Sequence, residues 1–218
     1  MTALPTALLE HWHHHADGTA RTLVLPDGCR DLICIHRLGE APQWLVSPLA
    51  DTAYGVDCGA GTRFWGYRLQ PGALVNEAAL LAAMGNCPTP EAADVLGRLD
   101  TFTHQDPRVT EALHGLAGTD RVAAAVRQLG VTERSLERLL ASATGRTPGY
   151  WLALARVRRA ARALAQPTPL AAVAADMGYA DQAHMGREFR RWFGVSPGRL
   201  RAWPELLAVA MASGHGTA

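Results

Sequence analysis

The sequence predicts an α+β chain: a β-rich sandwich or barrel first, then a helical connector, then an all-α domain of two helix-turn-helix units. Three observations support this order. Short apolar runs between Pro and Gly turns fill the first third, Ala- and Leu-rich helical segments follow, and the last hundred residues repeat one helical pattern. The expected parts are a β-rich domain at 1–75, a connector at 76–118, a double helix-turn-helix domain at 119–205 and a flexible tail at 206–218.

The first third has the alternation and the breakers of short β-strands. The expected strands are Thr22–Leu25, Leu32–His36, Gln43–Val46 and Thr62–Leu69. In the last of these, alternation puts Arg63, Trp65 and Tyr67 on one face of the strand, with their neighbours on the other. Short strands at this spacing form small antiparallel sandwiches or barrels.

Charge is distributed unevenly along the 218 residues, although the formal net charge is only +1. Residues 1–105 hold 6 Arg and 11 acidic residues, whereas residues 106–218 hold 15 Arg and 9 acidic residues, and the chain has no Lys. Fourteen of the Arg fall between Arg121 and Arg201. This concentration favours a polyanionic partner such as nucleic acid. Charge alone leaves open that these Arg only solvate helix faces.

The basic half contains an internal duplication. A Gly-x-(Thr/Ser)-Pro-Gly sequence closes both copies, first at Gly145–Gly149 and 49 residues later at Gly194–Gly198. In each copy a short helix, a Gly turn and a longer helix have helix-turn-helix spacing. The expected helices are Glu77–Met84, Pro90–Leu99 and Pro107–Leu116 in the connector, then Arg121–Leu129, Glu133–Thr144, Gly149–Ala165, Leu170–Met177 and Asp181–Phe193. Leu136 and Leu139 or Leu140 in the first copy, and Met185 and Phe189 in the second, are expected to face inward.

The segment Val122–Trp203 resembles the double helix-turn-helix DNA-binding domain of the AraC/XylS transcriptional regulators. The most specific match is Ala172–Pro197, which is similar to that family's C-terminal signature, and Leu129–Pro148 matches the first half. Two residues depart from the pattern. Leu140 stands where the family usually has Phe, and Ala180 stands where a capping Ser is common, which leaves Asp181 as the expected cap.

The resemblance implies which residues contact DNA. By position, Arg134, Glu137 and Arg138 of the first recognition helix and Gln182, Ala183 and Arg187 of the second meet the major groove. Arg can bond guanine, Gln can bond adenine and Ala can touch a thymine methyl. Ser135 completes the predicted set with His184, Arg190 and Arg191, and the last three are expected at phosphates. For each of these residues, a solvated position with no role is the alternative.

The first domain resembles the small β-rich sensor domain of one branch of these regulators. The matching residues are Leu25–Leu32 and Gly66–Ala73. The resemblance implies a small-molecule effector, and a dense aromatic set could hold one, although the same rings could simply form the core. The predicted ligand-binding residues are Trp12, Cys29, Tyr54, Arg63, Trp65 and Tyr67.

Two other groups of residues invite a different function. Adjacent residues in His11–His15 do not converge on one metal, so neither a metal site nor a cofactor is expected. The four Cys contain no CxxC pair. Cys34 is expected to pack inside a strand, whereas Cys29 and Cys58 lie beside turns and are expected to be accessible. A thiol-based redox or soft-metal-responsive regulator therefore stays an alternative.

The expected function is sequence-specific transcriptional regulation under the control of a small-molecule effector. No motif for nucleophilic catalysis or phosphate binding stands in an interpretable context, so we expect no enzyme, and the Cys spacing does not fit the zinc site of a DNA-repair methyltransferase. The expected partners are double-stranded operator DNA and RNA polymerase, with a second copy of the chain as a further candidate. Without an apolar stretch of spanning length or a secretory signal, a cytoplasmic location is expected. A DNA-binding regulator without a ligand is the second alternative.

Overall fold

The computed structural model describes residues 4–85, 87 and 93–217, and its chain divides into two compact units. The N-terminal unit comprises Met1–Thr22, Cys29–Leu49 and Gly55–Pro107, and the C-terminal unit comprises Leu23–Gly28, Ala50–Tyr54 and Arg108–Ala218. The C-terminal unit thus includes two short segments from the part of the sequence expected to be purely β-rich. The helices expected as a connector are also divided between the units.

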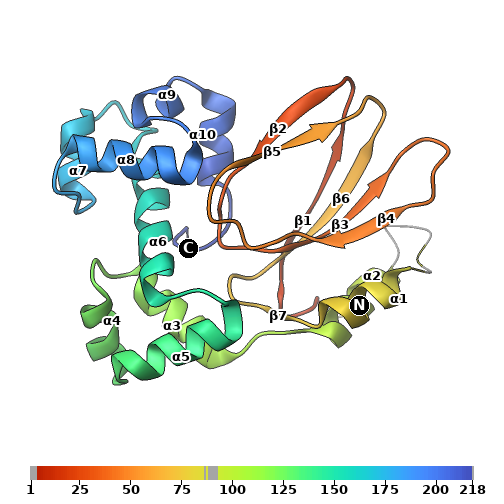
Figure 1. The fold of residues 1–218 in the computed structure, drawn as a ribbon, viewed down its shortest axis with the longest axis horizontal. Helices are drawn as coiled ribbons and strands as arrows, with labels where there is room; N and C mark the ends of the chain where they lie inside the picture. Colours follow the sequence, from red (N-terminus) through yellow and green to blue (C-terminus); the bar gives the residue numbers. More distant parts are fainter. Residues whose placement is uncertain (1–3, 86, 88–92, 218) are drawn as a thin grey trace. The chain divides into compact units, whose positions relative to one another are not determined.

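A four-stranded antiparallel sheet forms the centre of the N-terminal unit (Figure 1). Its order is β1 (Leu8–His15), β6 (Arg63–Leu69), β3 (Asp31–His36) and β4 (Gln43–Val46). Two smaller sheets pair β2 (Ala20–Val24) with β5 (Tyr54–Cys58), and β7 (Leu74–Val75) with β8 (Thr103–His104). The four expected strands are confirmed, whereas β1, β5, β7 and β8 were not predicted.

The two faces of the central sheet pack against different residues. On one face, Leu32, Val46 and Tyr67 form a core with α1 (Glu77–Met84) and α2 (Ala93–Phe102). On the other, Phe64 packs with Ala16 and Cys58. The alternation predicted for residues 63–68 is therefore confirmed. The helix expected at 90–99 begins at Ala93 in the structure, and its first three positions lie outside the described residues.

The C-terminal unit is all helix apart from its two inserted segments. Its helices are α3 (Pro107–Ala117), α4 (Val122–Leu129), α5 (Glu133–Thr144), α6 (Pro148–Ala163), α7 (Leu170–Asp176), α8 (Gln182–Phe193), α9 (Pro197–Arg201) and α10 (Pro204–Met211). The long helix α6 contacts α4, α5, α7, α8 and α10 (Figure 1). Its Trp151, Leu154 and Val157 are fully buried, so α6 is the centre of this unit's core. The expected fold class, β-rich first and double helix-turn-helix last, is confirmed.

The last residues differ from the flexible tail that the sequence predicted from residue 206. Helix α10 buries Leu206 and Ala210, and His215 beyond it is only 3% exposed. The Leu206/Ala210 spacing of four residues is the helical signal that marks the buried side of this segment. Among the residues described, no helix has the length and apolar character that crossing a bilayer requires.

Candidate nucleic-acid interface

Two helical hairpins of the C-terminal unit share one backbone design. Gly130 joins α4 to α5 at φ +65°, and Gly178 joins α7 to α8 at φ +72°. The second helix of each hairpin ends at another left-handed glycine, Gly145 at φ +68° and Gly194 at φ +71°. Only glycine adopts this region without strain, so these four residues fix both turns and both helix ends. The internal duplication is thus present in the backbone.

Side-chain caps start the helices at corresponding places in the two copies. The Thr132 side chain accepts from the backbone N–H of Ser135 at the start of α5, and the Asp181 carboxylate accepts from that of His184 at the start of α8. Asp181 is therefore the cap, as predicted. Thr147 and Ser196 do the same for α6 and α9, each followed by Pro at the first helical position.

The inward faces of α5 and α8 are those the spacing predicted. Leu136 and Leu140 are 2% and 0% exposed, and Met185 and Phe189 are fully buried. Because both helices are amphipathic, burying these positions turns the opposite stripe of each helix to solvent. Both helices contact α6, so the two exposed stripes share one support.

Six predicted base-contacting residues lie on the exposed stripes. They are Arg134, Glu137 and Arg138 on α5, and Gln182, Ala183 and Arg187 on α8. The charged and amide side chains among them make no hydrogen bond or ion pair with any residue that the structure describes. Their donors and acceptors are available to a partner in solution. Fork-shaped guanidinium groups and a carboxamide are the groups that read base edges in the major groove.

The other four predicted DNA contacts are engaged within the chain. The Ser135 hydroxyl lies 2.8 Å from that of Thr132. His184 accepts from the backbone N–H of Ala180, and its ring stands edge-on to Tyr179. Arg190 donates to the Gly186 carbonyl, and Arg191 lies 3.8 Å from the Glu188 carboxylate. These four side chains therefore have intramolecular contacts, unlike the charged and amide residues predicted to contact bases.

The arginines of α6 have structural partners. Arg158 is fully buried and donates to the carbonyls of Pro26 and Ala212. Arg159 lies 3.5 Å from the Asp120 carboxylate, and Arg156 donates to the Asp120 carbonyl. These arginines of α6 therefore stabilise the packing of neighbouring segments by hydrogen bonds and an ion pair. No role was predicted for Arg158, although its helical spacing from the buried Leu154, Val157 and Ala161 puts it on the core side of α6.

The inserted segment Ala50–Tyr54 is tied to the recognition half of the unit by polar contacts. The Tyr150 hydroxyl donates to the Ala50 carbonyl at 2.8 Å, and Arg146 pairs with Asp51 at 2.9 Å. The backbone N–H of Ala53 donates to the carbonyl of Trp192 in α8. Burial raises the pKa of Tyr150 far above its usual range, so its hydroxyl stays protonated as the donor.

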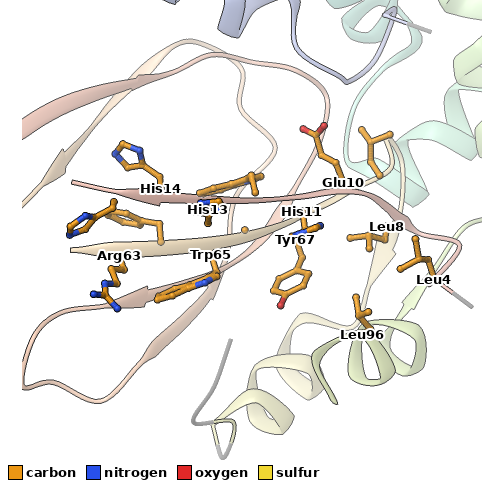
Figure 2. A pocket seen from close by; sticks show the side chains of 15 residues that line it. Leu4, Leu8, Glu10, His11, His13, His14, Arg63, Trp65, Tyr67 and Leu96 are labelled. Carbon is orange, nitrogen blue, oxygen red and sulfur yellow. The ribbon is translucent and has the colours of Figure 1, made fainter. Parts of the chain in front are cut away.

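A second candidate site lies in the N-terminal unit, where β1 and β6 form the wall of an open pocket of about 720 Å³ (Figure 2). Of the predicted ligand-binding residues, Trp12, Arg63, Trp65 and Tyr67 line this pocket, whereas Cys29 and Tyr54 do not. The Trp12 indole donates to Asp31 and lies against Gly66, where a Cβ would clash with the ring. Three of the six residues, Arg63, Trp65 and Tyr67, share one face of the sheet, whereas Trp12 packs with Phe64 on the other face.

The four Cys are all buried, which corrects the prediction that Cys29 and Cys58 are accessible: each is 4% exposed. Burial also raises the pKa of the Cys34 thiol to about 11, with Cys87 adding to the shift. A protonated, buried thiol reacts slowly, because the thiolate is the reactive form. Among the described residues, no group of three His, Cys, Asp or Glu could hold a metal ion.

The duplicated hairpins, their glycine turns and the two solvent-facing polar stripes define a double helix-turn-helix domain, an architecture that places recognition helices in the major groove. Known proteins identify the type. Residues 125–202 match the family model of a helix-turn-helix domain. The matched segment is a helix-turn-helix domain, and it lies within Val122–Trp203, the part of the sequence that resembles the AraC/XylS regulators.

Similar proteins extend this comparison. The HTH-type transcriptional regulator VirS of Mycobacterium tuberculosis is 36% identical over 109 residues, which make up 47% of this chain and 32% of the relative. The match thus spans about a third of that curated relative. A solved transcriptional regulator of Chromobacterium violaceum, titled as containing an AraC-type DNA-binding domain, covers 44% of this chain at 27% identity and a TM-score of 0.41, with 90% of its own chain matched. ToxT of Vibrio cholerae covers 90% of this chain at 9% identity and a TM-score of 0.45, with 98% of its own chain matched.

Proposed function

We propose that this protein is a sequence-specific transcriptional regulator that binds operator DNA through α5 and α8 and responds to a small molecule held in its N-terminal unit. One observation carries the DNA-binding part. The exposed stripes of both recognition helices present side chains without intramolecular partners, Arg134 and Arg138 on one and Gln182 and Arg187 on the other. Groups left unpaired in the free chain are available for bonds to base edges.

The two recognition helices read successive major-groove segments on one face of the duplex. Helix α6 lies between them in sequence, contacts both, and has 16 residues, which at about 1.5 Å each span ~24 Å. Successive major grooves on one face lie about one helical turn, ~34 Å, apart. A stiff helix of this length, with the widths of α5 and α8 added, fits that interval.

Effector control rests on the pocket at β1 and β6. A volume of about 720 Å³ is within the range of small-molecule sites, roughly 300–1,000 Å³. A ligand there acts on operator affinity if it favours one conformation of the chain by about 1–3 kcal/mol, the usual size of such coupling. RNA polymerase and a second copy of the chain are the partners that regulation of transcription would add. A regulator without any ligand is the competing proposal, and its signature is operator affinity unaffected by every pocket ligand.

The test of DNA reading is a footprint of the full chain on an operator selected from random duplexes. Wild type is expected to protect two segments one turn apart on one face. Arg138→Ala should lose the segment read by α5 and Arg187→Ala the segment read by α8. Arg127→Ala, an exposed Arg in the last turn of α4, is the matched control and should keep both. Protection on opposite faces, or the same loss from all three variants, contradicts the proposal.

A further inference from the structure

The pocket wall on β1 and β6 brings imidazole, guanidinium and aromatic groups to one face of the sheet. In the antiparallel register His11 lies opposite Tyr67, His13 opposite Trp65 and His15 opposite Arg63. Alternate residues of a strand share a face, so these six side chains leave the sheet on the same side. Figure 2 shows His11, Tyr67, Trp65 and Arg63 below the two strands, and Glu10 and His14 above them.

Glu10 is the single acidic residue among those that line the pocket, and its carboxylate is engaged on the opposite face. There Arg68 donates to Glu10 at 2.9 Å and to Asp31 at 3.3 Å. The Asp31 carboxylate also accepts from the Trp12 indole. Both acids are thus paired with Arg68, so neither neutralises the groups on the pocket side.

Three polar side chains on the pocket side have no partner among the described residues. Arg63, His11 and His13 make no hydrogen bond or ion pair there, whereas His15 pairs with Asp17 at 3.3 Å. A guanidinium that faces a hollow without a carboxylate is a site for an anion, since it offers paired N–H donors in a fork. The His13 imidazole, opposite Trp65, adds a donor next to it, and His11 lies further along β1, opposite Tyr67.

The opposite end of the pocket is apolar. Leu4, Leu8 and Leu96 line it beside Tyr67, which is 7% exposed and belongs to the core of the sheet and α2. Trp65 lies between this end and Arg63, two residues along β6 from each of Arg63 and Tyr67. Side chains two residues apart on a strand are about 6.6 Å apart, so the polar and apolar ends are separated by roughly 13 Å. The pocket is therefore elongated and amphipathic.

We propose that this pocket binds a planar organic anion, with its acidic group at Arg63 and its apolar body along Trp65 and Tyr67 toward the leucines. Aromatic faces take up flat apolar rings at little entropic cost, and the absence of an available acid among the lining residues selects against cations. The inference rests on the proposed function only in taking this ligand as the effector. Binding itself is independent of DNA.

The test is calorimetric titration of the full chain with 2-naphthoate and with its neutral counterpart, 2-naphthamide. The carboxylate is expected to bind about tenfold tighter, the gain of one charge-assisted hydrogen bond. Arg63→Gln should bring the two ligands to similar affinity. Arg21→Gln, an exposed Arg on β2 outside the pocket, should keep the preference. Trp65→Leu should weaken both ligands by a similar factor, since it removes the shared apolar contact.

Equal affinity of the wild type for both ligands, no binding of either, or a preference that survives Arg63→Gln overturns the proposal. The same titrations repeated with operator DNA separate it from the function. A charge-selective naphthoate site that leaves operator affinity unchanged contradicts effector control and leaves the ligand class standing. A wild-type chain that binds operator DNA but does not prefer 2-naphthoate to 2-naphthamide contradicts the ligand class alone.

Discussion

Gly28 offers the sharpest test of how the C-terminal unit is built, because a single methyl group there would enter the core. Its φ is +81°, and a Cβ would lie 2.8 Å from the His215 Cβ and 2.9 Å from Cζ3 of Trp151. The Leu154 side chain is 3.2 Å away. These neighbours belong to α6 and the C-terminal segment, which Arg158 and the backbone bond from His215 to Asp27 hold in place. Helix α6 and the C-terminal segment are therefore held together, and neither can move away from Gly28 without disrupting its contacts with the other.

Two costs add in Gly28→Ala. A left-handed backbone costs an L-residue about 1–2 kcal/mol. Forcing a methyl into a packed core costs about 1–3 kcal/mol more. Gly145→Ala is the matched control, because Gly145 has φ +68° in the same unit and nothing lies within 4 Å of its Cβ position. The control variant has only the backbone cost, so the difference in free energy of unfolding between the two variants measures the clash of the methyl group at Gly28.

The assay is thermal and urea unfolding of the full chain, followed by the fluorescence of its tryptophans. Gly28→Ala is expected to lose about 1–3 kcal/mol more than Gly145→Ala, which at roughly 2–4 °C per kcal/mol is a further fall in Tm of several degrees. Equal losses in the two variants would refute the reasoning. They would mean that Leu23–Gly28 does not pack on α6 in solution.

Three further predictions concern DNA reading, acid sensitivity and the thiols. Gln182→Ala should relax base preference at one or two operator positions by about 1–3 kcal/mol, while Arg191→Ala should weaken all sequences alike and lower the salt slope by about one; equal weakening of specific and random DNA by Gln182→Ala would contradict its role as a base reader. Burial lowers the pKa of His215 from 6.5 to about 4. As pH falls from 6.5 toward 4, the His215 imidazole is therefore protonated in the unfolded chain and stays neutral in the folded chain. The contribution of neutral His215 to the free energy of unfolding is fully present above pH 6.5 and declines by about 3 kcal/mol toward pH 4. In urea unfolding, the free energy of unfolding of His215→Gln should therefore fall less steeply with pH than that of the wild type. Identical pH profiles of the two proteins would contradict this. All four Cys should react with a thiol reagent far more slowly in the native chain than in denaturant, and a fast native phase would revive the thiol-sensor alternative.

The helix-turn-helix half could be predicted from sequence because its signals are local. The Gly turns and the Asp181 cap were predicted from residues a few positions apart, and the structure has them at Gly130, Gly178 and Asp181. The inward positions followed from the 3.6-residue period in the same way. Leu140, which departs from the Phe of the AraC/XylS pattern, is fully buried, because an apolar side chain of similar size fills the same space.

The β-rich half was harder to predict for two physical reasons. Strand β1 carries His11, His13 and His15 on its exposed face, so its pattern lacks the apolar alternation that marks a half-buried strand. The segment forms a strand because it pairs with β6, which is about fifty residues away in sequence. Cys29 and Cys58 were expected to be accessible because they lie beside turns, yet both are buried, since burial depends on what packs over a turn.

The inserted segments could not be predicted because they carry no signal of their own. Leu23–Gly28 reads as a strand end and a Pro-Asp-Gly turn, and Ala50–Tyr54 reads as a polar loop. Their place in the C-terminal unit depends on single long-range bonds, such as Arg158 to Pro26 and Tyr150 to Ala50. Such partners, a hundred residues or more apart in sequence, leave no trace in periodicity.

The number of Arg in the basic segment overstates the positive charge that is available to bind DNA. Fourteen Arg between Arg121 and Arg201 pointed to a polyanion, but six of them hold the fold through carbonyls or carboxylates: Arg146, Arg156, Arg158, Arg159, Arg162 and Arg201. The electrostatic attraction to DNA therefore depends on the other eight. Because a structural Arg and a phosphate-binding Arg are identical in sequence, only the partner of each guanidinium separates them. Three of the Arg that the fold leaves unpaired, Arg134, Arg138 and Arg187, lie on the outward stripes of α5 and α8, and none lies on α6, which is why the interface is proposed there and not on the Arg-rich helix α6.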